Sequence, residues 1–213
     1  LLALCAIPTQ AAVPTNFVDE PKVNMLADPV GFAFLPGGRM LIVEQTTGDI
    51  KHFDGAFVTT LATLPDVQIS YEEGLLGIAV DPGWPTKPHI YVHYTSDEVP
   101  SKIHITRFTL SGDLVGNAGG ALTLNLATRY EILTDIPNQF FNHNGGTVRF
   151  GPDQMLYVSL GGENLGCPSA QDSTHLDGKI LRLNILGLPD GPGGPPSKAL
   201  IAPVDNPFAA HPN

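Results

Sequence analysis

A strand–turn–strand pattern that occurs three times constrains the fold of this chain more than any other feature of its sequence. The copies span residues 32–43, 78–94 and 148–159, and each joins two apolar, β-rich runs through a turn that contains proline. Further β-like runs accompany the copies, at residues 48–53, 103–110 and 179–184. A unit repeated with Gly and Pro turns and about four short strands is typical of a β-propeller, in which blades stack because none buries its faces alone. The sequence therefore predicts an all-β propeller.

The number of copies predicts that the propeller is incomplete. Three copies correspond to roughly three blades, whereas closed propellers have about four to eight. Residues 188–213 are rich in Pro and Gly and contain no run that reads as a closing strand. We therefore expect the chain to be the front half of a longer propeller, with two blade faces left exposed.

Composition agrees with an all-β fold and limits the partners. The 213 residues include 23 Gly and 20 Pro, and only 15% are charged, which favours many turns over long amphipathic helices. A hydrophobic content of 42% is enough for the core of one domain or of part of a larger one. The net charge of −10 argues against nucleic acid binding, which needs a basic face. An anionic cofactor would need a local cation or a metal ion.

The first residues resemble the end of an export signal. Residues 1–7 are almost wholly apolar, and residues 9–12 include the small side chains that suit a cleavage site. We interpret residues 1–12 as the remnant of a signal peptide and residues 13–213 as the mature domain, which predicts a periplasmic or secreted location. A buried first strand is the alternative. No other stretch is long enough to span a membrane, and loss of Cys5 with the signal would leave Cys167 without a disulfide partner.

A histidine precedes the third strand–turn–strand copy. Residues 142–161 contain His143, then Gly145 and Gly146, then two β-rich runs around a Pro turn. The two glycines allow another chain or a ligand to approach the backbone closely. An imidazole at a rigid strand end suits a general base, because its ordinary pKa lies near working pH. The alternative is a histidine that caps or packs.

Other histidines and motifs do not indicate a site. His89 and His93 have the spacing of a helical metal pair, but the run around them reads as a strand, on which they would stand roughly 13 Å apart. We therefore expect both on a β-surface rather than on a metal. The sequence around its serines lacks the G-x-S-x-G pattern of hydrolases.

Five pieces of the sequence, in order across residues 26–208, resemble one enzyme family. They are residues 34–41, 73–79, 143–157, 170–172 together with 178–183, and 205–208. In these pieces the chain resembles the soluble glucose/sorbosone dehydrogenases, which are aldose sugar dehydrogenases that depend on pyrroloquinoline quinone (PQQ). The resemblance implies a six-bladed β-propeller, in agreement with the repeat and with an incomplete chain.

The resemblance also implies a reaction and a catalytic base. In this family the histidine that matches His143 takes the proton from the C1 hydroxyl of an aldose, while the C1 hydride passes to the quinone. Loss of hydride is easier as the hydroxyl becomes an alkoxide, so a base at that oxygen lowers the barrier. The sugar would leave as a lactone, and the electrons would pass to an external acceptor.

Further positions match the family near its cofactor. Glu72 stands where the family has Gln or Glu beside cofactor and substrate, and Gln171 matches a glutamine in a loop toward the cofactor. A solvated carboxylate and a residue that bonds loop backbone are the respective alternatives. Lys179 and Arg182 are expected to hold the loop and the blade edge rather than to touch the cofactor.

One position departs from the family pattern. The family usually has Gly-Asp after the hairpin, and that Asp orients the histidine, whereas this chain has Gly162 in the Asp position and Glu163 after it. An orienting carboxylate fixes the tautomer and stabilises the imidazolium. Glu163 could substitute through its longer side chain, or the base could be weakened.

The remaining cofactor groups of the family are expected beyond residue 213. They are an Arg-Asn pair that holds the quinone carboxylates and the ligands of a calcium ion. We therefore expect residues 1–213 alone to bind PQQ poorly and to be inactive. The competing hypotheses are a non-catalytic binding propeller, like that of Hedgehog-interacting protein, and a propeller lactonase, for which no set of metal carboxylates is evident.

Overall fold

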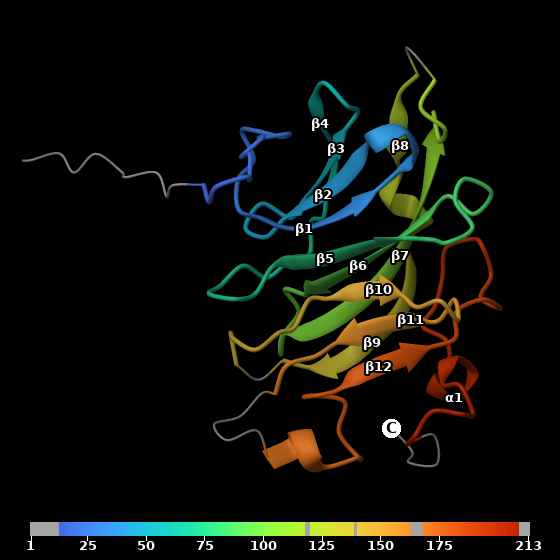
Figure 1. Ribbon diagram of the computed structural model, residues 1–213. Helices are drawn as coiled ribbons and strands as arrows, with labels where there is room; N and C mark the ends of the chain where they lie inside the picture. Colours follow the sequence, from blue (N-terminus) through green and yellow to red (C-terminus); the bar gives the residue numbers. More distant parts are fainter. Residues whose placement is uncertain (1–12, 118–119, 139, 163–167, 209–213) are drawn as a thin grey trace, which may run out of the picture.

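The computed structural model describes residues 13–117, 120–138, 140–162 and 168–208. Within these residues the chain forms antiparallel strands, and its helical segments are no longer than four residues (Figure 1). The all-β prediction is thus confirmed for the described part. The predicted signal segment 1–12 and Cys167 lie outside it.

The first sheet contains four strands in the order β1-β2-β3-β4. Their bounds are β1 Pro29–Phe34, β2 Met40–Glu44, β3 Asp49–Phe53 and β4 Val58–Thr63. The short η1 turn Pro36–Gly38 joins β1 to β2, with Gly37 at a φ of 78° that favours glycine. One face of β1 exposes Val30, Phe32 and Phe34 to solvent.

The second sheet is the largest, with the order β5-β6-β7-β8 and β9 paired to β7. Its elements are β5 Leu75–Val80, β6 His89–Thr95, β7 Lys102–Gly112, β8 Leu122–Leu124, the η2 turn Leu126–Thr128 and β9 Tyr130–Pro137. Every residue of β6 is buried, because this strand has neighbours on both sides and a sheet packed on each face.

The third sheet has the order β10-β11-β12. Its strands are β10 Val148–Phe150, β11 Leu156–Ser159 and β12 Ile180–Leu183, followed by the short helix α1 Lys198–Ile201, and η3 Pro168–Gln171 lies between β11 and β12. The predicted turn at residues 151–154 joins β10 to β11. The Asp153 carboxylate there accepts hydrogen bonds from Tyr157 and Arg182, and so links the turn to β11 and β12.

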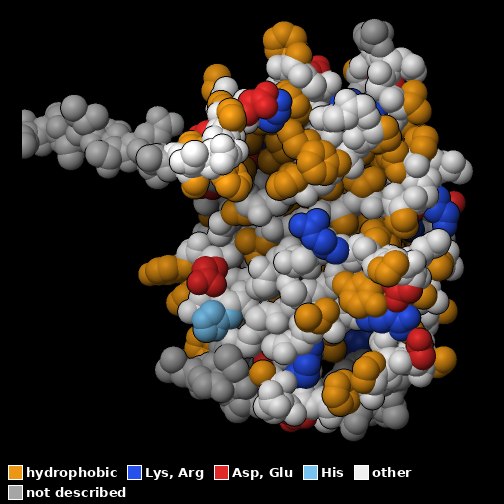
Figure 2. All heavy atoms as spheres, in the orientation of Figure 1, with side chains coloured by type: hydrophobic (Ala, Val, Ile, Leu, Met, Phe, Trp, Pro, Cys, Tyr) orange, Lys and Arg blue, Asp and Glu red, His pale blue; other side chains and the backbone are white. Residues whose placement is uncertain are grey.

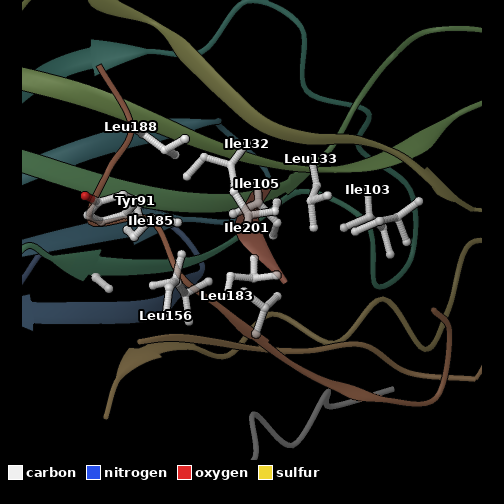
Figure 3. Close-up of a cluster of buried hydrophobic side chains, with 14 of the residues drawn as sticks. Tyr91, Ile103, Ile105, Ile132, Leu133, Leu156, Leu183, Ile185, Leu188 and Ile201 are labelled. Atoms are coloured by element: carbon white, nitrogen blue, oxygen red, sulfur yellow. The ribbon is translucent and has the colours of Figure 1, made fainter. Parts of the chain in front are cut away.

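The second sheet lies between the other two, with one hydrophobic cluster on each face. One cluster packs β2 and β3 against β5, β6 and β7. The other, drawn in Figure 3, packs β6, β7 and β9 against β11, β12 and residues 185–201. The first strands of the three sheets contact one another in the order β1, β5, β10. Strand–turn–strand units therefore stack face to face as the repeat predicted, whereas the number of blades in the whole protein stays a prediction.

In the part of the chain that the structure describes, no helix has the length and apolar character needed to cross a membrane.

The prediction that His89 and His93 lie on a β-surface was wrong. Both are on a strand, β6, as expected, but His93 is 0% exposed and His89 only 3%. The sequence pattern did not reveal that sheets cover both faces of this strand. Burial lowers the pKa of His93 to about 4, so the ring is neutral at ordinary pH.

The buried histidine makes stability depend on pH. His93 has a pKa of about 4 in the folded state and about 6.5 when unfolded, so the unfolded chain binds the proton first as the pH falls. We expect the contribution of His93 to the free energy of unfolding to be constant above pH ~6.5. It should fall by about 3 kcal/mol between pH ~6.5 and ~4. Urea unfolding at several pH values measures this slope.

The His93→Leu variant separates this residue from the others. Burial also lowers the pKa of His89 and His52, so part of the slope should remain in the variant. A variant with the full wild-type slope would contradict the assignment to His93.

Candidate active site

The loop between β9 and β10 presents His143 at the surface. His143 is exposed and has a φ of 63°, a left-handed conformation that is uncommon outside glycine. Such strain is tolerated where surrounding contacts fix the backbone, and it occurs often at functional sites. The contacts that fix this loop come from β5, from the loop before β5 and from the end of β11.

The His143 ring is oriented by a backbone carbonyl. Its Nδ1 lies 2.8 Å from the carbonyl oxygen of Gly162. A carbonyl can only accept, so Nδ1 carries a hydrogen, and in the neutral form of the ring the lone pair is then on Nε2. At the position where the family pattern has an orienting Asp side chain, the main chain of Gly162 therefore fixes the tautomer. Glu163, the other candidate for this role, lies outside the described residues.

Glu72 contacts the main chain of the same loop. One of its carboxylate oxygens accepts a hydrogen bond from the His143 amide at 2.7 Å, and the Glu72 amide donates to the Phe141 carbonyl at 3.1 Å. Glu72 is itself exposed. The structure thus brings together two residues that are 71 positions apart, and Glu72 holds the backbone of His143.

A chain of buried polar side chains lies beneath the loop. Asn138 donates to Glu73 at 2.6 Å and to the Ser101 hydroxyl at 3.0 Å, while Asn144 donates to Asn138 at 2.7 Å. Glu73, Asn138 and Asn144 are all buried. Buried polar groups are costly unless they are hydrogen-bonded, so these bonds fix both ends of the His143 loop.

Sequence reasoning missed this network. Glu73 was visible beside Glu72, and Asn144 beside His143, but no sequence pattern indicates that Glu73 points inward toward a residue 65 positions away.

Glycines allow the loop to approach its neighbours at backbone distance. A Cβ on Gly77 would overlap the carbonyl oxygen of Gly146, and one on Gly161 would overlap that of His143. A Cβ on Gly145 would likewise overlap the carbonyl of Ser159. Close approach does occur at Gly145 and Gly146, but the approaching groups are segments of this same chain, Leu76 and Ser159, and not the other chain or ligand that was expected.

A pocket of ≈ 410 Å³ opens beside this loop, between the first strands of the three sheets. Its lining residues are Val30, Gly31, Phe32, Gln45, Tyr71, Glu72, Leu76, Gly77, Ile78, Gly145, Gly146, Thr147, Val148 and Arg149. Arg149 is the one basic residue among them, it is exposed, and it forms no ion pair within the described residues. Figure 2 shows an exposed histidine beside an acidic side chain at one edge of the molecule.

Gln171, Lys179 and Arg182 form no hydrogen bond or ion pair with His143 within the described residues. Gln171 ends η3 with an exposed side chain, and no contact among the described residues joins it to Glu72 or His143. Lys179 donates to the Ser169 and Asp177 carbonyls, at 2.9 and 3.0 Å. Arg182 bonds Asp153, Asp205 and Asn206. Lys179 and Arg182 thus hold the loop and the sheet edge, as predicted.

No group of three or more His, Cys, Asp or Glu residues that could hold a metal ion is found in the described ranges.

Comparison with known proteins gives a family. The model of the glucose/sorbosone dehydrogenase family matches residues 26–211. An aldose sugar dehydrogenase of Escherichia coli (strain K12) is 27% identical over 192 residues, covering 88% of this chain and 49% of that protein. Quinoprotein glucose dehydrogenase B of Acinetobacter calcoaceticus is 24% identical over 201 residues, covering 81% of this chain and 40% of that protein.

A solved structure is similar as well. The PQQ-bound form of an aldose sugar dehydrogenase from Streptomyces coelicolor superimposes with a TM-score of 0.64 at 31% identity, covering 81% of this chain and 48% of that one. The chain therefore spans about half the length, or less, of these relatives.

The glycine contact beneath the loop predicts the effect of one methyl group. We expect Gly77→Ala to push Gly146 away and to destabilise the protein by about 1–3 kcal/mol, because the obstacle is backbone and cannot rotate aside. Urea unfolding measures the loss. The exchange rate of the His143 amide, which is bonded to Glu72, should rise with it.

Gly187→Ala is the matched control, since a Cβ there meets no atom within 4 Å. Its stability should stay within about 0.5 kcal/mol of the wild type. Equal effects of the two substitutions would contradict the tight contact at Gly77.

Proposed function

Since the chain belongs to the glucose/sorbosone dehydrogenase family, we propose that the protein containing it oxidises aldose sugars at C1 to the lactone, with PQQ as cofactor. The relatives named above are sugar dehydrogenases and a quinoprotein, which supports this class of reaction. His143 is the proposed general base.

The single observation that carries the proposal is the hydrogen bond from His143 Nδ1 to the Gly162 carbonyl. It leaves the lone pair on Nε2 of an exposed ring, which is the form that a general base requires. The ring has a defined orientation because the carbonyl is part of the main chain beside Gly161, which itself packs against His143.

The residues of this chain act on the proton and on the position of the substrate. His143 Nε2 accepts the proton of the C1 hydroxyl, so that negative charge develops on the oxygen as the C–H bond breaks. PQQ, when bound, supplies the acceptor for the C1 hydride. Glu72 holds the His143 amide and so keeps the base at the strand end. The carbonyl of Gly162 carries no full charge, so it orients the imidazolium more than it stabilises its charge.

The pocket beside the loop has one feature that fits a cofactor with carboxylates. Arg149 offers a guanidinium without a carboxylate partner among the described residues, on an otherwise acidic chain. Gln45 and Thr147 line the same pocket and supply neutral polar groups. We propose that Arg149 on β10 and Thr147, the residue before this strand, face the cofactor. One arginine does not neutralise three carboxylates, so the protein needs further cations.

The remaining parts of the proposal concern the whole protein. We propose a six-bladed propeller of which the three sheets are the first blades, with the Arg-Asn pair and the calcium ligands beyond residue 213. Export, and transfer of electrons to an external acceptor, belong to the same proposal. Gln171 and Glu163 stay candidates for cofactor contact. The non-catalytic propeller has less support, because the relatives named above are dehydrogenases.

Removing the base tests the proposal. In the full-length protein supplied with PQQ and calcium, we expect aldose-dependent reduction of an artificial electron acceptor. His143→Ala should lower kcat by about 10²–10⁴, the usual contribution of a general base. Binding of PQQ should be retained, because the side chain removed is not a cofactor ligand in this proposal.

His175→Ala serves as the control, since His175 is also exposed but pairs with Asp172 and Asp177 and is not among the residues that line the pocket. Its rate should equal that of the wild type. Absence of sugar oxidation in the intact protein, together with absence of PQQ binding, would favour a binding propeller instead.

A further inference from the structure

Two exposed aromatic rings stand next to the proposed base. Tyr71 and Phe141 stack with ring centroids 5.4 Å apart and an interplanar angle of 29°. Tyr71 is 85% exposed and Phe141 57%, although both are large and could pack inside. Tyr71 directly precedes Glu72, and Phe141 lies two residues before His143.

The backbone beneath the two rings is fixed. The Glu72 amide donates to the Phe141 carbonyl, so the two loops are joined directly under the pair. Gln45 donates to the Tyr71 carbonyl at 3.2 Å and to the Glu73 carbonyl at 3.0 Å. Tyr71 has a φ of 50°, a conformation that a tyrosine adopts only where the surroundings impose it. The rings are therefore presented at a set position rather than on free loops.

The surroundings of the rings favour a neutral ligand over an anionic one. Glu72 adjoins the pair, whereas the one basic residue of the pocket, Arg149, is on β10. A carboxylated quinone would meet like charge beside the rings, which disfavours it there. A sugar is neutral, and its hydroxyl groups can donate to a carboxylate.

The shape of the pair also suits a sugar. A pyranose ring has a face of C–H groups, and the negative face of an aromatic ring attracts such groups while it excludes water from them. Stacking on Phe141 covers one face of each ring and supports Tyr71, which lines the pocket and offers apolar surface at its edge. A pyranose on this surface would have its hydroxyl edge near Glu72 and His143.

We propose that Tyr71 and Phe141 form a sugar-binding platform that holds the pyranose ring of the substrate beside His143. This inference rests on the proposed function, since it assigns the substrate subsite of that reaction. It makes the two aromatic residues determinants of sugar affinity, whereas His143 determines the rate of proton removal.

Steady-state kinetics of the full-length holoenzyme test the platform. Tyr71→Ala and Phe141→Ala should each raise the KM for glucose about 3- to 10-fold, with kcat changed less than about twofold, because stacking contributes to ground-state binding. Tyr71→Phe and Phe141→Tyr keep a ring and should keep the wild-type KM. Phe57→Ala removes an aromatic side chain that is 72% exposed elsewhere, and should change nothing.

A second measurement does not depend on turnover. Saturation-transfer NMR with glucose on the cofactor-free protein should show contact in the wild type and in Phe57→Ala, and reduced contact in Tyr71→Ala. Tyr71→Leu keeps apolar bulk without a flat ring, and should also lose contact if the protein folds normally by circular dichroism.

The outcomes separate the two proposals. Wild-type holoenzyme without sugar oxidation would overturn the proposed function, whereas normal oxidation with an unchanged KM in both alanine variants would overturn the platform. A weakened affinity for PQQ, with an unchanged KM for glucose, would assign the rings to the cofactor and overturn the sugar subsite. Sugar contact at the wild-type level in Tyr71→Leu would also overturn the sugar subsite, because no flat ring would then be needed.

Discussion

The backbone contact between β5 and the loop before β10 is the constraint on which the rest of the site depends. Gly77 of β5 and Gly146 of the loop lie so close that a side chain at either position would push the two backbones apart. This contact sets the distance between the second and third sheets where the loop emerges. Because Gly161 packs against the carbonyl of His143 in the same way, the position of the histidine follows from the packing of main chain on main chain.

The site divides into a buried half that determines geometry and an exposed half that can meet ligands. Below the loop, Asn138 bonds both Glu73 and Asn144 out of water, while one carboxylate oxygen of Glu73 and the amide oxygen of Asn144 are buried without a partner, which costs free energy. Above it, His143 and the stacked aromatic pair face solvent. The two halves are linked by neighbours in sequence, since Glu73 follows Glu72 and Asn144 follows His143. Adjacent residues at these two points thus serve opposite sides of the loop.

The sequence predicted the features that depend on neighbouring residues, and not those that depend on packing between sheets. The strand–turn–strand units were recognisable because alternation, Gly and Pro act locally. The burial of His93 was not, because the two polar histidines interrupt the apolar run of β6 and suggest a face open to solvent, although a nearly continuous run is typical of a strand covered on both faces. Gly162 was recognised as lacking a side chain that could orient the base, but its carbonyl is a group that every residue carries, so its role appears only in three dimensions.

The distribution of charge around the pocket gives each of its edges a different chemical preference. The chain has a net charge of −10, and a carboxylated ligand gains attraction only near Arg149 within the described lining of this pocket. Glu72 repels the same ligand at the edge that carries the aromatic pair and the histidine. A neutral polyhydroxylated ligand is attracted to that edge, where it finds a flat apolar surface and a hydrogen-bond acceptor. Arg149 and Glu72 would therefore favour ligands of different charge at different parts of one pocket lining.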